Sequence, residues 1–325
     1  MSQLWPRAAD PAHNSRDVSA TLHDTMLALL ERRVAALRRS RPGLDQALTL
    51  QQAIIRTQLS SSRPPAVSLF PLPRQHVVAR VQDGVPLLHE QPVTVDVHYA
   101  ADLFTRLVQA LSPRFDSLIG PSYAGRLDHE HLFGEAFVQH ADHLAQIARD
   151  VEVDAELLGA AATLSVAPSL RAYAARLLPL VQQAETSDNA SWTRGYCPIC
   201  GGWPLLAELR GVDHAYWLRC AACGSGWAGD VTRCPYCGNS DSRTRATLTL
   251  DGEQRFHVAA CEHCKGYLKV GSALQPPPTE LLAIDDVAGL HFDLAALERG
   301  FRRPPGSGYR IELAMPDDEW VEEIE

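Results

Sequence analysis

Trp192-Thr-Arg-Gly-Tyr-Cys-Pro-Ile-Cys-Gly201 opens a stretch that ends at Cys261-Glu-His-Cys-Lys-Gly-Tyr-Leu-Lys269 and contains every cysteine of the 325-residue chain. The eight cysteines form four Cys-x-x-Cys pairs: Cys197/Cys200, Cys220/Cys223, Cys234/Cys237 and Cys261/Cys264. Two cysteines separated by two residues can direct both sulfurs at one ion, while nearby backbone N–H groups donate to the thiolates. Eight thiols are therefore enough for two tetrahedral sites.

The four pairs read as a module used twice. Each copy opens with Cys-Pro-x-Cys-Gly, and its second pair follows after 19 residues in the first copy and 23 in the second. Such spacings suit a hairpin-to-hairpin zinc ribbon or rubredoxin-like fold. We therefore expect one ion on Cys197, Cys200, Cys220 and Cys223, and another on Cys234, Cys237, Cys261 and Cys264. A cross-braced pairing, first pair with third and second with fourth, stays open.

Disulfides and thioredoxin-type redox pairs explain the pattern less well. Disulfides need an oxidising compartment, and the residues after Met1 contain no apolar signal-peptide core. A thioredoxin-type pair normally occurs once, after a strand of a βαβ unit, whereas this chain has four pairs. We expect metal ligation in a cytoplasmic protein. All-thiolate sites accept zinc or iron, and the spacing does not decide between them.

Composition limits the partners. The formal net charge is −9, and a divalent ion on four thiolates would add two negative charges at each site. Residues 194–269 hold nine Lys/Arg against seven Asp/Glu, an excess too small to indicate nucleic-acid binding. No apolar run reaches the ~18 residues of a membrane span. Weak self-association stays open.

The sequence before the cysteines predicts helices. Leu22, Met26, Leu30, Val34 and Leu37 recur at helical spacing, and the run ends at Arg41-Pro-Gly. Further helices are expected at about 44–59, 96–111, 132–149, 154–165 and 169–184, with Pro179 kinking the last, and another at 285–300. A proline-rich loop is expected after the second helix, and Gly271 to Thr279 reads as a linker.

These patterns predict an α+β multidomain protein, with an N-terminal all-α domain followed by two tandem rubredoxin-like (zinc-ribbon) modules. The expected domains are an α-helical domain at 1–187, metal modules at 188–232 and 233–272, and a linker, short helix and acidic tail at 273–325. The six carboxylates among Asp317 to Glu325 are expected to be solvated.

Other candidate chemistry is sparse. His140-x-x-His143 and Asp128-His-Glu-His lack the spacing of a zinc-binding helix, so we interpret them as exposed or hydrogen-bonded polar residues. No phosphate loop, nucleophile elbow or kinase-type motif is present in the sequence. The two lysines of the chain, Lys265 and Lys269, flank the last cysteine pair, either by chance or because they lie beside a metal–thiolate centre or meet an acidic partner.

The cysteine stretch resembles the formate dehydrogenase accessory protein family, FdhE. The motifs that carry the resemblance are Trp192-Thr-Arg-Gly-Tyr-Cys-Pro-Ile-Cys-Gly, Leu218-Arg-Cys-Ala-Ala-Cys-x3-Trp227, Arg233-Cys-Pro-Tyr-Cys-Gly and Cys261-Glu-His-Cys-Lys-Gly-Tyr-Leu-Lys269. The resemblance extends more faintly to Gly84-Val-Pro-Leu-Leu88 and to Asp285-Asp-Val-Ala-Gly-Leu-His-Phe-Asp-Leu.

The resemblance implies a cytoplasmic assembly protein rather than an enzyme. Proteins of this family are thought to bind the catalytic subunit of respiratory formate dehydrogenase before its twin-arginine export. Their rubredoxin-like centres favour iron, with zinc possible, and the eight cysteines are the implied ligands. Two alternatives stay open: a rubredoxin-like electron-transfer protein, and a zinc-ribbon module that binds nucleic acid. The helical domain is the expected surface for a partner.

Overall fold

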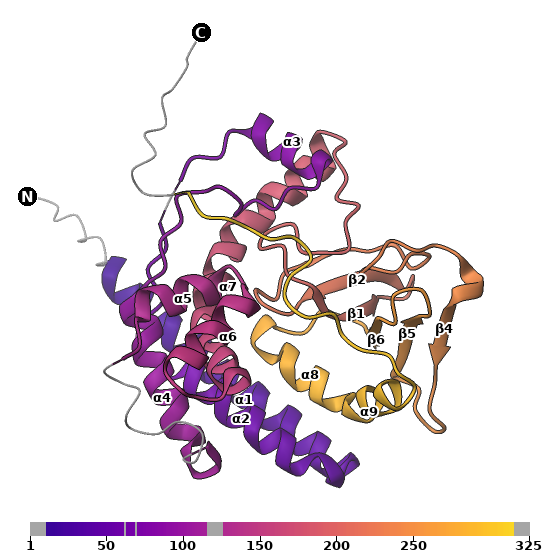
Figure 1. Cartoon of the computed structure of the whole chain (residues 1–325), viewed down its shortest axis with the longest axis horizontal. Coiled ribbons are helices and arrows are strands. Elements are labelled where there is room, and N and C mark those ends of the chain that lie inside the picture. Colours follow the sequence, from indigo (N-terminus) through magenta and orange to yellow (C-terminus); the bar gives the residue numbers. More distant parts are fainter. Residues whose placement is uncertain (1–10, 62, 69, 116–125, 315–325) are drawn as a thin grey trace, which may run out of the picture.

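The computed structural model describes residues 11–61, 63–68, 70–115 and 126–314. Helices make up the N-terminal part, and a sheet with two four-cysteine clusters makes up the C-terminal part (Figure 1). Two short helices follow the sheet and pack against it, and the last described segment runs back between the sheet and the helical part. The acidic run from Asp317 lies outside the described residues.

The helical part follows the apolar spacing of the sequence. Its helices are α1 (Pro11–Ser40), α2 (Asp45–Leu59), α3 (Arg74–Asp83), α4 (Val97–Phe115), α5 (His129–Phe137), α6 (Ala141–Asp150) and α7 (Ala155–Ser187). The predicted helices at 44–59 and 96–111 are found as α2 and α4, with ends shifted by no more than about one turn. The helix predicted from Leu22 to Arg41 is found as α1, which begins earlier, at Pro11. Helix α3 was not predicted, because its apolar face is short and reduces to Val77 and Val81.

Three helix predictions need correction. The helix expected at 132–149 is two helices, because Gln139 adopts φ 62° and turns the chain between α5 and α6. The helices expected at 154–165 and 169–184 are one continuous helix, α7, which contains both Pro168 and Pro179. The helix expected at 285–300 is α8 (Leu282–Ala288) and α9 (Leu290–Glu298), which meet at Gly289.

Helix α7 continues through Pro168 because a neighbour replaces the lost hydrogen bond. Proline has no N–H, so the carbonyl four residues earlier, that of Leu164, loses its helical donor. The Gln58 amide of α2 donates to the Leu164 oxygen at 2.8 Å. Gln58 is itself buried, so this hydrogen bond satisfies a carbonyl that has little access to water.

Within the described residues, both cysteine modules join in one six-stranded sheet of order β3-β2-β1-β6-β5-β4. The first module contributes β1 (Pro204–Arg210), β2 (Ala215–Cys220) and β3 (Gly226–Ala228), and the second contributes β4 (Arg245–Leu248), β5 (Phe256–Cys261) and β6 (Tyr267–Ala273). Pairs within a module are antiparallel, whereas β1 pairs with β6 in parallel. Strand β6 extends into the stretch expected to be a linker.

Two hydrophobic cores lie on the two faces of this sheet. Leu268 and Val270 of β6 belong to a core with α3 to α7 and the first module. Tyr267 belongs to the other core, which includes α1, α2, α8 and α9. Alternate residues of a strand point to opposite faces, so β6 contributes to both cores. Both cores contain helices from before residue 187 and strands from after it. The three boundaries between the four expected domains stay predictions.

Candidate metal centres

All four Cys-x-x-Cys pairs adopt the same turn. The N–H of the first cysteine donates to the carbonyl five residues later at 2.9 Å in every pair, which joins Cys197 to Gly202, Cys220 to Ser225, Cys234 to Asn239, and Cys261 to Gly266. The residue after the second cysteine has positive φ each time: Gly201 at 70°, Gly224 at 72°, Gly238 at 73° and Lys265 at 56°. The sequence repeat is therefore a repeat of backbone conformation.

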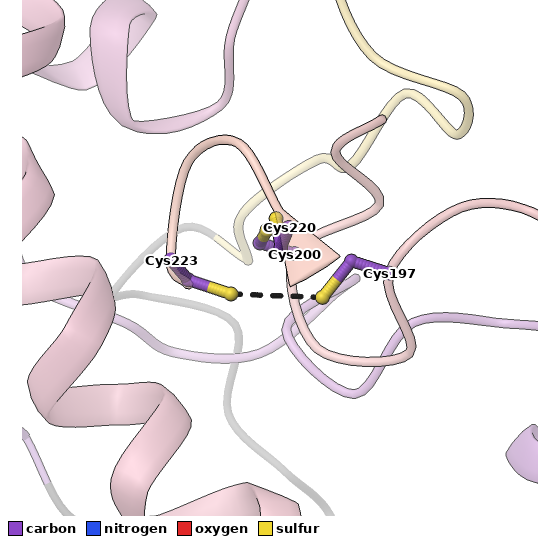
Figure 2. Close-up of side chains that lie close together, drawn as sticks. All are labelled: Cys197, Cys200, Cys220 and Cys223. Carbon is purple, nitrogen blue, oxygen red and sulfur yellow. Dashed lines mark hydrogen bonds between the residues drawn. The ribbon is translucent and has the colours of Figure 1, made fainter. Parts of the chain in front are cut away.

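The first cluster brings together Cys197, Cys200, Cys220 and Cys223 (Figure 2). The sulfurs of Cys197 and Cys223 are 3.6 Å apart, and those of Cys200 and Cys220 are 3.4 Å apart. Metal–sulfur bonds of about 2.3 Å place the corners of a tetrahedron about 3.8 Å apart. The sulfurs thus have the spacing of a tetrahedral site, and they lie too far apart for disulfides, whose sulfurs are about 2.05 Å apart.

The second cluster brings together Cys234, Cys237, Cys261 and Cys264. The sulfurs of Cys234 and Cys264 are 3.7 Å apart, and those of Cys237 and Cys261 are 3.8 Å apart. In both clusters all four sulfurs lie within 4.8 Å of one another. The structure therefore groups consecutive pairs, and it does not bring together the cross-braced sets.

The two clusters differ in their contact with solvent. All four cysteines of the first are buried, whereas Cys237 and Cys264 of the second are exposed. Burial raises the pKa of Cys197, because a thiolate without a counter-charge is poorly solvated inside the protein. Four thiolates can share such a site only around a cation, which is the condition that a divalent ion meets.

Hydrogen bonds support the sulfurs of the second cluster. Burial alone would raise the pKa of Cys261. Hydrogen bonds from the backbone N–H groups of Cys264 and His263 and from the Asn239 amide have the larger effect, and the pKa falls to about 7. The Asn239 amide donates to Cys261 Sγ at 3.7 Å, and the Gly266 N–H donates to Cys264 Sγ at 3.3 Å. Such donors stabilise a thiolate, the form that binds metal.

Segments distant in the sequence cover the first cluster. The carbonyls of Pro198, Ile199, Cys200 and Gly201 all accept hydrogen bonds from outside the module. Leu87 and Leu88 donate to the first two of these carbonyls, the Gln139 amide to that of Cys200, and Gly308 and Tyr309 to that of Gly201. The first cluster therefore lies where the helical part and the C-terminal segment meet.

The two lysines have different surroundings. Lys265 is exposed and pairs with Glu262, whereas Lys269 is 1% exposed. The Lys269 ammonium lies 2.6 Å from an Asp293 oxygen and 2.8 Å from an Asp286 oxygen, so its acidic partners are internal residues of α8 and α9. Arg303 also contacts both carboxylates. Lys269 thus attaches the C-terminal helices to the sheet.

The bend between α5 and α6 gathers a third set of candidate ligands. Glu135, His140 and His143 have ligand atoms within 4.8 Å of one another. The sequence indicated the two histidines but not Glu135, whose position five residues before His140 was the available signal. Asp128, in contrast, caps α5 by accepting from the His131 N–H at 3.1 Å.

A pocket of about 590 Å³ lies between the two modules. It borders the second cluster along Cys234 to Gly238. Its wall is rich in aromatic side chains: Trp192, Tyr196, Trp203, Tyr216 and Tyr236.

Comparison with known proteins supports a family resemblance. No protein-family model matches the chain. The "Protein FdhE homolog" of Aquifex aeolicus (strain VF5) is 26% identical over 117 residues, which span 35% of this chain and 41% of that protein. The crystal structure of the FdhE protein from Pseudomonas aeruginosa aligns with a TM-score of 0.51 at 22% identity, covering 87% of this chain and 95% of that one, and shows the fold.

In the part of the chain that the structure describes, no helix combines the length and the apolar character needed to cross a membrane. Similarity in sequence to a curated FdhE homologue, together with the fold of a crystallised FdhE protein, confirms the resemblance to the FdhE family that the cysteine motifs predict.

Proposed function

We propose that the chain is an accessory protein for the maturation of formate dehydrogenase. The similarity to FdhE proteins supports such a role in general. The finer proposal is that the protein works in the cytoplasm and binds the catalytic subunit of respiratory formate dehydrogenase before its twin-arginine export.

The metal part of the proposal is that each cluster holds one ion on four cysteines, in a rubredoxin-like centre. The observation that carries it is the spacing of 3.4 to 3.8 Å between paired sulfurs in both clusters. All-thiolate tetrahedral sites accept both iron and zinc. Iron is our first choice of metal and zinc the second, because the resemblance to the FdhE family implies iron.

Closed ligand sets support a role other than catalysis. A metal bound by four thiolates has no coordination position for water or substrate, as in structural zinc sites. The ions would contribute to folding, because metal binding to thiolates stabilises the folded state over the unfolded chain. We infer a rigid metal-stabilised module, with the helical part offering the surface for a client.

Metal analysis tests the metal part. Protein purified without oxygen is expected to contain two ions, and Cys197→Ser and Cys261→Ser should each lose one. After oxidation with ferricyanide, iron would give the visible absorption of a ferric thiolate centre, and zinc would be colourless. Loss of the same ion from both variants would contradict the assignment.

A capture experiment tests the accessory role. The tagged chain should retain the catalytic subunit of formate dehydrogenase that still carries its export signal, and a deletion strain should lose formate dehydrogenase activity. A strain that assembles fully active enzyme without this protein would overturn the proposal.

Electron transfer is the second candidate function. The exposure of Cys237 and Cys264 favours it, because electrons pass more readily to a partner from a centre near the surface. Reversible reduction of an iron-loaded second centre would support this function, and a native zinc load would exclude it.

A further inference from the structure

A His/Glu cluster at the bend between α5 and α6 lies apart from the cysteines. Glu135 is in the last turn of α5, His140 precedes α6, and His143 is in the first turn of α6. One oxygen of Glu135, Oε2, lies 2.8 Å from His140 Nδ1 and 2.8 Å from His143 Nδ1. Two helices therefore converge on one carboxylate oxygen.

We propose that Glu135, His140 and His143 form a third metal site, which takes one divalent ion of the zinc type. A carboxylate oxygen with two imidazole nitrogens is a common ligand set for such ions. The ligand atoms are closer than the roughly 3.3 Å that bonds of about 2.0–2.1 Å imply for a tetrahedron, so small side-chain rotations must open the triangle.

The backbone holds the three residues in place. The His140 N–H donates to the Glu135 carbonyl at 3.0 Å, across the bend at Gln139. The side chains of Glu135 and His140 are 18% and 15% exposed, so few rotamers are open to them, whereas His143 is 49% exposed and faces solvent. Two largely buried ligands and one exposed ligand leave a path for an ion to enter.

Hydrogen bonds favour the ligand form of the carboxylate. Burial raises the pKa of Glu135, but the hydrogen bonds from His143 and His140 lower it by more, so the carboxylate is ionised. Neutral imidazole is the form of His140 and His143 that would bind a metal.

Pockets adjoin the site on two sides. One of about 360 Å³ includes His131, Glu135 and His143 in its wall, and one of about 280 Å³ includes His140, His143 and Arg310. Three protein ligands leave a fourth position for water, unlike the closed cysteine clusters. The third site is therefore expected to exchange its ion more easily than the cysteine centres.

Arg310 competes with the ion. Its Nε donates to His140 Nε2 at 3.1 Å, which leaves the ring proton on Nδ1, the nitrogen that must bind the metal. Arg310 is exposed, so its guanidinium can turn to solvent when an ion binds. The site then responds to two variants in opposite directions: loss of a ligand weakens binding, and loss of Arg310 strengthens it.

The third site also contacts the first cysteine cluster. Gln139, between Glu135 and His140, donates to the Cys200 carbonyl at 3.0 Å. The neighbours of Arg310, Gly308 and Tyr309, donate to the Gly201 carbonyl. An ion at the third site would therefore tie the helical bend to the segments that cover the first cluster.

Calorimetric titration with Zn²⁺ tests the proposal on the full chain with both cysteine centres already filled. Wild type should bind one further ion, and the double variant Glu135→Gln/His143→Ala should bind it more than about 100-fold more weakly, since loss of an outer partner alone costs about 10–100-fold. Arg310→Gln should bind it more tightly than wild type. His76→Ala, on the exposed start of α3, is the matched control and should bind as wild type does.

Two outcomes would overturn the proposal: a wild-type protein that binds no third ion, and a double variant that binds this ion as tightly as wild type does. Thermal unfolding before Zn²⁺ is added shows whether each variant is folded, and Glu135→Gln alone, which keeps the shape of the side chain, provides a second test if the double variant is not. The result does not depend on any client protein, so failure here leaves the proposed function untouched.

Discussion

The residue after the second cysteine of each pair has the same backbone conformation in all four turns. The position after the second cysteine needs a left-handed backbone, which glycine adopts without a steric penalty. Three of the four turns have glycine there, and Lys265 takes the same conformation in the fourth. Similar φ values do not mean similar surroundings, because a Cβ at Gly201 would meet the Tyr309 oxygen at 2.4 Å, whereas at Gly238 the nearest atom is 3.7 Å away.

Two alanine substitutions separate backbone strain from steric conflict. Gly238→Ala should cost about 1–2 kcal/mol, the penalty of a left-handed residue with a Cβ. Gly201→Ala should cost more, because it also displaces the Tyr309 carbonyl that lies over the first cluster. The measurement is the free energy of unfolding in denaturant, and equal losses in the two variants would contradict the proposed contact.

Lys269 is predicted to matter far more than Lys265. Lys269→Met removes the buried cation between Asp293, which is buried, and Asp286, which is partly exposed, and should lower the free energy of unfolding by about 3–5 kcal/mol. Lys265→Met is the matched control on an exposed side chain, and its ion pair is worth at most about 1 kcal/mol. Urea titration compares the two variants. A small effect at Lys269 would mean that Arg303 alone balances Asp286 and Asp293.

At the scale of elements, helix length depended on partners that lie far away in the sequence. Helix α7 passes through Pro168 because the Gln58 amide of α2 donates to the Leu164 carbonyl, which has lost its helical donor. The opposite happens at Gln139, where apolar spacing suggests one helix but the chain bends. Apolar periodicity reports which face is buried, and it does not report such local bonds.

Asp96 makes the start of α4 sensitive to acid. It accepts from the Tyr99 N–H at 3.0 Å and from the Ala66 N–H at 2.9 Å, and it pairs with Arg63 at 2.6 Å. The Arg63 hydrogen bond is the largest cause that lowers the pKa of Asp96, from 3.8 to about 2. A pKa lowered by folding means that the carboxylate stabilises the protein above about pH 4, and that this stability is lost as the pH falls towards 2.

Asp96→Asn should therefore destabilise the protein by roughly 1–2 kcal/mol at neutral pH, because asparagine keeps the helix cap but loses the carboxylate charge that pairs with the half-exposed Arg63. The difference from wild type should shrink as the pH falls from about 5 to about 2. Denaturant unfolding over that range measures it, with the exposed Asp251→Asn as control. A difference that stays constant with pH would show that the charge of Asp96 contributes nothing.

At the scale of the whole molecule, the parallel pairing of β1 with β6 joins the first strand of the first module to the last strand of the second. Each module alone is a small three-stranded unit, and the pairing makes one sheet whose faces complete both cores. The first cluster is enclosed by the helical part, and the second lies nearer the surface. The two centres are thus alike in local turn and different in environment.

This difference predicts that a chelator removes the two ions at different rates. With zinc in both centres, the second should lose its ion first, because Cys237 and Cys264 are exposed and the four cysteines of the first are buried. A coloured chelator should report two phases, with the fast phase missing in Cys261→Ser and the slow phase missing in Cys197→Ser. A single phase would show that both ions leave through one unfolding step.

The sequence left the grouping of the four cysteine pairs open, and by itself it determined the Cys-x-x-Cys turns and the helical character of the residues before them. Both depend on local spacing, because a Cys-x-x-Cys turn and an amphipathic helix are built from residues close in the chain. Only the tertiary structure decided that the modules share one sheet, that Lys269 meets Asp286 and Asp293, and that Glu135 joins His140 and His143. These contacts join segments whose approach depends on strand register, buried charge and one backbone bend, and local spacing encodes none of the three.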